Sequence, residues 1–114
     1  MIIQGNIHTD PRGNIHFVND FTFDGIKSFY TITHPKTSTI RAWQGHKLET
    51  KYFYVTKGSF LIKWINIDIW EQPLKNLKIN TRILTDNRSE ILLIAPGHVN
   101  GFKAVESVNN DGLF

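Results

Sequence analysis

The chain of 114 residues has no cysteine, so it holds no disulfide framework and no thiolate chemistry, and we expect a cytoplasmic setting. No apolar run approaches the roughly 20 residues that a membrane-spanning helix needs, and the first residues lack the basic and apolar regions of a signal peptide. Lysine and arginine exceed aspartate and glutamate by 13 to 10, but the bases are scattered. Scattered bases argue against a nucleic-acid or membrane partner. The length and composition predict one domain over residues 1–114 with one core.

Helical periodicity is also missing over any long window, and short β-branched and aromatic runs recur between turn signals instead. Many short, evenly spaced strands predict an all-β sandwich, jelly roll or barrel. We expect strands at residues 2–8, 14–20, 27–34, 40–46, 51–57, 59–70, 77–84 and 90–94, with a last pair around 101–108 and after 112. The strong hairpin turn at 110–112 is followed by only two residues. Either the chain stops short of the natural C-terminal strand or the second arm comes from elsewhere.

The centre of the chain carries candidate chemistry on two expected strands. The period of two places Gln44 and His46 on one face of the first strand. On the second strand, Lys51 shares a face with Phe53 and Val55. If that face points into a barrel, Lys51 enters a water-poor interior, where a lysine is costly unless it meets an anion. The alternative places Lys51 at the strand end with its ammonium in water.

Three segments together resemble one known family. They are Asp10-Pro11-Arg12-Gly13, Arg41-Ala42-Trp43-Gln44-Gly45-His46-Lys47 and Pro96-Gly97-His98-Val99-Asn100-Gly101-Phe102. Their order and spacing resemble the dTDP-4-dehydrorhamnose 3,5-epimerases and their sugar 3,4-ketoisomerase relatives over roughly residues 8–105. Lys51 and the turn Lys57-Gly58-Ser59 follow at a similar distance. The resemblance implies a cupin fold, an all-β double-stranded β-helix jelly roll.

The chain departs from this family at positions that matter. The base of the epimerases, three residues after the arginine, is replaced by Gln44, whereas the second histidine of the ketoisomerases matches His46. Asn100 replaces the histidine of the Pro-Gly segment, and no tyrosine follows that segment. A metal cupin would need histidines at these places and a glutamate farther along than Glu49. One imidazole and two amides make a poor site for a first-row metal, so we expect no metal and no cofactor.

The resemblance implies a sugar-nucleotide epimerase or ketoisomerase that removes a proton next to the ketone of a dTDP- or UDP-linked 4-keto-6-deoxy sugar. His46 would be the base and Lys51 would stabilise the enolate. The expected substrate-binding residues are Arg12, Arg41, Gln44 and Asn100. The resemblance also implies a homodimer that exchanges N-terminal strands, so that Arg12 could serve the partner's barrel. The alternatives are a non-catalytic carbohydrate-binding cupin and a metal-dependent oxygenase.

Several further side chains are candidates for substrate binding or for the acid. Trp43 or Tyr30 could stack on a base or sugar ring, Tyr30 or Tyr52 could act as the acid, and His98 could enter the barrel mouth. The other histidines, namely His8, His16 and His34, are interpreted as strand-end or turn residues. Arg41 and Gln44 have opposite parity on a regular strand, so they share a ligand only if a bulge lies nearby, and Gly45 could provide it.

Overall fold

The computed structural model describes residues 1–34, 37, 39–68 and 77–105, with the side chain of His46 excepted. The regular structure of this part is entirely β, which confirms the all-β prediction. The strands are β1 (Ile2–Gln4), β2 (Asn6–Asp10), β3 (Gly13–Phe17), β4 (Ile40–His46), β5 (Lys51–Phe53), β6 (Ser59–Asn66), β7 (Ile79–Thr85), β8 (Glu90–Ile94) and β9 (His98–Val105). The expected hairpin turn at 110–112 and the expected strand after 112 lie outside the described residues. No helix long and apolar enough to cross a membrane occurs in the described ranges.

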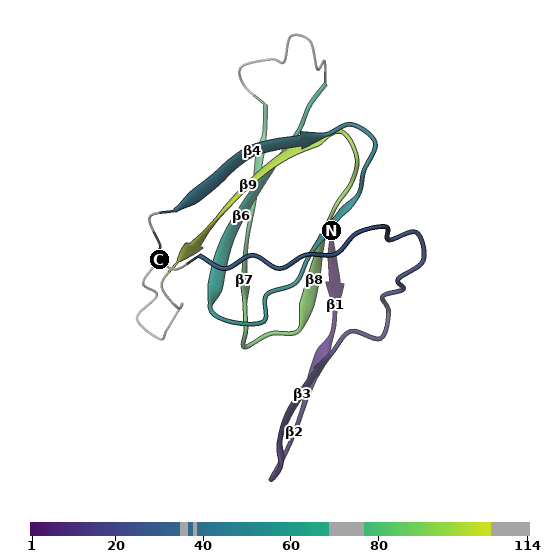
Figure 1. The fold of residues 1–114 in the computed structure, drawn as a ribbon, viewed down its shortest axis with the longest axis vertical. Helices are drawn as coiled ribbons and strands as arrows, with labels where there is room; N and C mark the ends of the chain where they lie inside the picture. Colours follow the sequence, from purple (N-terminus) through teal and green to yellow (C-terminus); the bar gives the residue numbers. More distant parts are fainter. Residues whose placement is uncertain (35–36, 38, 69–76, 106–114) are drawn as a thin grey trace.

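Two antiparallel sheets make the body of the molecule (Figure 1). One has the strand order β4-β9-β6-β7 and the other the order β1-β8-β5. The first sheet contributes Ile62, Leu84 and Phe102 to the core, and the second contributes Leu92 and Ile94. Because side chains alternate along a strand, each sheet turns one apolar face inward, as in a β-sandwich.

A buried ion pair also joins the two sheets. Arg82 on β7 donates from an Nη atom to Glu90 Oε2 on β8 at 2.9 Å, and the Glu90 side chain is 2% exposed. A buried carboxylate is tolerated only when it is paired, so this contact links β7 to β8 next to the core.

β2 and β3 form a separate hairpin that projects from the body (Figure 1). The predicted strand 2–8 is split at Gly5, whose amide donates to the Ser89 carbonyl at 2.8 Å. A Cβ at this position would lie 2.1 Å from the Phe17 carbonyl oxygen, so only glycine fits between β1 and β2. The segment 10–13, at the junction of β2 and β3, forms the turn that closes the hairpin, with Gly13 at a φ of 129°.

The expected strand 27–34 is wrong, because this segment forms no strand in the structure. Phe29 and Tyr30 are 83% and 66% exposed, whereas Ile32 packs against the core. Strand propensity measures how well side chains fit a pleated, half-buried surface. This segment pairs with none of the described strands, so its β-forming residues have no such surface to fit. Other expected strands differ at their ends. β5 stops at Phe53, β7 begins at Ile79, and β9 begins already at His98.

Candidate functional site

Three of the predicted site residues, on β4 and β9, lie on the inner face of the sandwich. Strand β9 turns Phe102 into the core, and its register pairs Phe102 with Arg41 and Asn100 with Gln44. Residues directly opposite each other in a sheet share a face, and so do residues two apart. Arg41, Gln44 and Asn100 therefore face the same side as the core, with Arg41 and Gln44 solvent-exposed on the edge strand β4.

A β-bulge brings Arg41 and Gln44 to this common face. Between them β4 advances three residues, while β9 advances two from Phe102 to Asn100. The bulge that was expected from their parity is thus present, but it lies at Ala42–Trp43 and not at Gly45, which pairs regularly with Val99. Gly101 faces the bulge, and a Cβ on it would lie 2.7 Å from the Ala42 Cβ.

Lys51 lies on the inward face of its strand neighbours, at the first position of β5, and its ammonium meets the solvent-exposed Gln44. Phe53 and Val55 pack against the core, and Lys51 is half-buried. Its Nζ donates to Gln44 Oε1 at 3.4 Å, so an amine from β5 meets an amide from β4. Burial lowers the pKa of Lys51, and the charge of Glu49 opposes this effect.

Asn100 is buried deeper than the other members of this cluster. It is 1% exposed, and its Nδ2 has no hydrogen-bond partner. A buried donor without a partner costs about 1–3 kcal/mol, so a water or ligand oxygen at this position would stabilise it.

His34 joins the cluster from the irregular segment, and sequence reasoning missed it. Arg41 Nε donates to His34 Nε2 at 3.1 Å, and the imidazole stacks on Phe102 with a centroid distance of 5.6 Å and an interplanar angle of 17°. Burial, and then the charge of Arg41, lower the pKa of His34, so the ring stays neutral at neutral pH. Ile32 also packs against the core, but strand periodicity gave no signal for His34, because this segment forms no strand.

His98 and His46 lie opposite each other at one end of the β4–β9 pair. His98 Nδ1 lies 2.9 Å from the Ala95 carbonyl oxygen and 3.2 Å from that of Pro96. Because carbonyls only accept, Nδ1 carries the proton, and the lone pair of neutral His98 is on Nε2. The His46 side chain lies outside the described part, so its role as the base stays a prediction.

Arg12 does not join Arg41 and Lys51 within one chain. It lies in the turn between β2 and β3, and its guanidinium pairs with Asp10 at 2.8 Å. The hydrogen bond from Arg12 is the main cause that lowers the pKa of Asp10.

Two aromatic residues that were expected to take part also lie away from the inner face. Tyr30 is 66% exposed, and Tyr52 contacts the Phe21 ring on the face of β5 opposite to Lys51.

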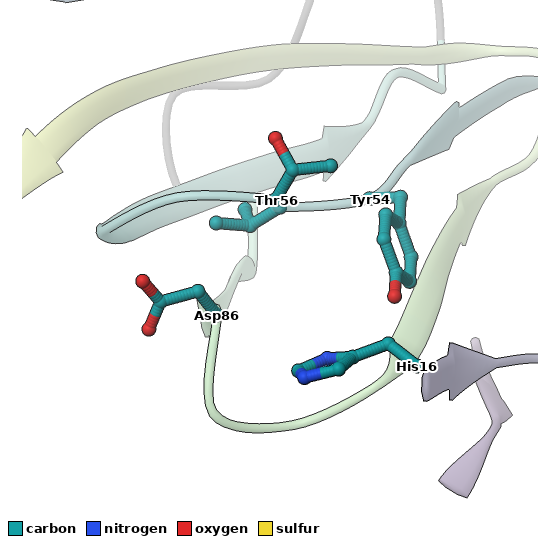
Figure 2. A pocket seen from close by; sticks show the side chains of 5 residues that line it. His16, Tyr54, Thr56 and Asp86 are labelled. Carbon is teal, nitrogen blue, oxygen red and sulfur yellow. The ribbon is translucent and has the colours of Figure 1, made fainter. Parts of the chain in front are cut away.

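A separate cavity of about 420 Å³ lies where β3, the segment after β5 and the turn between β7 and β8 meet. Its lining residues are His16, Tyr54, Val55, Thr56 and Asp86. Figure 2 shows the side chains of His16 and Tyr54 on one side of this hollow and Asp86 on the other. Hydrogen bonds within the fold already hold two of them, since Tyr54 contacts Ser89 and Asp86 accepts from the Gly58 amide. None of the predicted site residues lines this cavity.

Within the described ranges, no group of three or more His, Cys, Asp or Glu side chains could hold a metal ion. The donors on the inner face include the amides of Gln44 and Asn100, which are weak ligands for first-row metals. The expectation that the protein works without a metal rests on these donor types and stays a prediction.

A scan against protein-family models finds no match, and a search of the curated proteins finds none either. Among solved structures, the chain is similar to the RmlC epimerase of Mycobacterium tuberculosis, with a TM-score of 0.49, 16% identity, and coverage of 93% of this chain and 57% of that one. It is also similar to a dTDP-4-dehydrorhamnose 3,5-epimerase from Bacillus anthracis strain Ames, solved with TDP and PPi bound. The TM-score there is 0.47, the identity 14%, and the coverage 93% of this chain and 65% of that one. The chain thus spans less than two thirds of either protein's length.

Proposed function

We propose that this protein is a sugar-nucleotide isomerase, either an epimerase or a ketoisomerase, that acts on a dTDP- or UDP-linked 4-keto-6-deoxy sugar. The observation that carries the proposal is the cluster of Arg41, Gln44, Lys51 and Asn100 on the inner face of the sandwich, next to an apolar core. Arg41, Gln44 and Asn100 belong to the segments that resemble the epimerases and ketoisomerases, and Lys51 follows the second segment at a similar distance. The proposal includes a cytoplasmic setting, supported by a chain without cysteine.

The proposed chemistry begins with removal of a proton from the carbon beside the ketone by His46, which leaves an enolate. Lys51 stabilises the negative charge that develops on the oxygen, because a half-buried ammonium interacts with it more strongly than an ammonium in bulk water does. Burial lowers the pKa of Lys51, which makes its ammonium a better proton donor to that oxygen. The sugar hydroxyls bind to two amides. One is Gln44, which is hydrogen-bonded to Lys51, and the other is Asn100, whose Nδ2 has no hydrogen-bond partner within the fold.

Arg41 binds the diphosphate in this proposal, because a guanidinium fits phosphate oxygens with paired hydrogen bonds. Arg12 contributes from a second copy of the chain, since its own hairpin carries it away from the inner face. The functional unit is therefore proposed to be a homodimer, and the projecting hairpin supports this.

Proton exchange with solvent tests the proposed chemistry. When the protein is incubated with the 4-keto sugar nucleotide in deuterated water, we expect deuterium at C3 or C5, measured by NMR or mass spectrometry. The substitution Lys51→Met should reduce the exchange rate about 100- to 1000-fold, which is the typical effect of removing one oxyanion stabiliser. Lys57→Met is the matched control, since Lys57 is exposed in a turn and should leave the rate unchanged.

The same experiment separates the enzyme from a non-catalytic binding protein. Binding of the nucleotide sugar, followed by its effect on the melting temperature, without any deuterium incorporation would favour the binding protein. Equal exchange rates for wild type and Lys51→Met would show that the enolate is stabilised elsewhere.

A further inference from the structure

The contact between Arg41 and His34 fixes the protonation of the imidazole. A guanidinium carries only donors and stays protonated at any working pH, so Arg41 Nε donates and His34 Nε2 accepts across their 3.1 Å contact. His34 is therefore neutral, and its single proton sits on Nδ1. Its Nδ1 is buried without a hydrogen-bond partner, so this ring is held by its contact with Arg41 and by packing.

Aromatic packing holds the His34 ring in place. The ring stacks on Phe102 and lies 5.5 Å from the Phe60 ring, both centroid to centroid. Phe102 is the residue that pairs with Arg41 between β9 and β4. The imidazole, the core phenylalanine and the arginine therefore form one connected unit, in which the core orients the ring and the ring orients the guanidinium.

The two nitrogen atoms of His34 leave it no free lone pair for proton transfer. The Nε2 lone pair is taken by Arg41, and Nδ1 carries the proton. A neutral acceptor also leaves the full positive charge on the arginine, whereas a carboxylate in this place would neutralise it. Within the described residues, the contact of Arg41 is this imidazole and not a carboxylate.

We propose that His34 is a positioning residue that holds Arg41 through Nε and so presents its two terminal amino groups to the diphosphate of the substrate. The terminal groups supply four N–H donors in a fixed fork, and such a fork binds a phosphate with two parallel hydrogen bonds. Fixing the fork before binding reduces the loss of side-chain freedom when the ligand arrives. This proposal rests on the proposed function, in which Arg41 binds the diphosphate.

Two substitutions at position 34 separate orientation from packing. His34→Phe keeps an aromatic ring against Phe102 and removes the acceptor, so the unliganded protein should melt at the same or a higher temperature. Its affinity for dTDP and UDP, measured by calorimetry, should fall about tenfold, the effect of one hydrogen bond to a charged group. His34→Gln places an amide oxygen at a similar reach and should restore the affinity to within about threefold of wild type.

A ligand without phosphate provides the matched control. Thymidine or uridine should bind wild type and His34→Phe equally, because the proposed effect acts only through Arg41 and the diphosphate. Wild-type affinity for the diphosphates in His34→Phe, or a failure of His34→Gln to restore it, overturns the positioning role while the proposed function stands. If wild type binds neither dTDP nor UDP, the proposed function fails and takes the diphosphate role of His34 with it.

Discussion

At the scale of single residues, two histidines at paired positions of β4 and β9 are candidates for the proposed base. The backbone holds His98 with its proton on Nδ1 and its lone pair on Nε2, which is the orientation of a general base. His46 stands opposite it in register and matches the second histidine of the ketoisomerases. Substituting each histidine in turn and measuring the exchange rate distinguishes which of them is the base.

The substitution His46→Asn should lower the deuterium exchange rate by about two to four orders of magnitude, the usual cost of losing a general base. His98→Gln should reduce the exchange rate less than tenfold. If His46 is the base, the His98 ring, hydrogen-bonded to backbone carbonyls, serves mainly to shape the mouth of the site. Both rates are measured in deuterated water with saturating sugar nucleotide, and binding of dTDP should be retained in both variants. The opposite order of the two rates would assign the base to His98.

The period of two predicted which residues share a face on the regular strands, and there it was sufficient. It placed Lys51 with Phe53 and Val55, and in the structure Phe53 and Val55 pack against the core while Lys51 is half-buried. It could not predict the contact of Arg41 with His34, because His34 lies in an irregular segment whose course depends on tertiary packing. It also gave no means of locating His98 Nδ1 against the Ala95 carbonyl, a contact made by the turn before β9.

At the scale of elements, the proposed site depends on the bulge on β4. Without the extra residue, Arg41 and Gln44 would point to opposite faces, and only one of them could meet the ligand. The sequence indicated that a bulge was required but placed it at Gly45, because glycine is common at bulges. The glycine that matters is on the other strand, where Gly101 makes room for Ala42.

The substitution Gly101→Ala should therefore destabilise the protein and weaken ligand binding together. The new methyl group would lie 2.7 Å from the Ala42 Cβ, and relieving this overlap should cost about 1–3 kcal/mol of unfolding free energy in urea titration. Moving β4 outward also shifts Arg41 relative to Gln44, so the affinity for dTDP should fall.

The double variant Gly101→Ala with Ala42→Gly tests that reason. Removing the Ala42 methyl group relieves the overlap, so the second substitution should recover most of the lost stability. Additive losses in the double variant would mean that Gly101 matters for another reason.

At the scale of the whole molecule, the shape is that of a sandwich with an arm. The radius of gyration is 15.5 Å, whereas a compact domain of this length has about 13 Å, and the longest extent is 55 Å. The β2–β3 hairpin accounts for much of this extension (Figure 1). An isolated two-stranded hairpin is marginally stable in water, so a projecting hairpin is expected to pack against something. Ile15 on β3 is 58% exposed and offers an apolar contact for it.

The proposed occupant is the second copy of the chain, and one substitution on the hairpin tests it. Wild type should sediment as a dimer at micromolar concentration in analytical ultracentrifugation. Ile15→Lys should shift the equilibrium toward the monomer. The dimer would lose the apolar area that Ile15 buries, and the lysine ammonium would have to be desolvated at the contact. Asn14→Lys is the matched control, since Asn14 is the exposed neighbour on the other face of the same strand and should leave the dimer intact. A monomeric wild type would leave Arg12 at the tip of a free arm, and the diphosphate would then have to be bound by Arg41 without it.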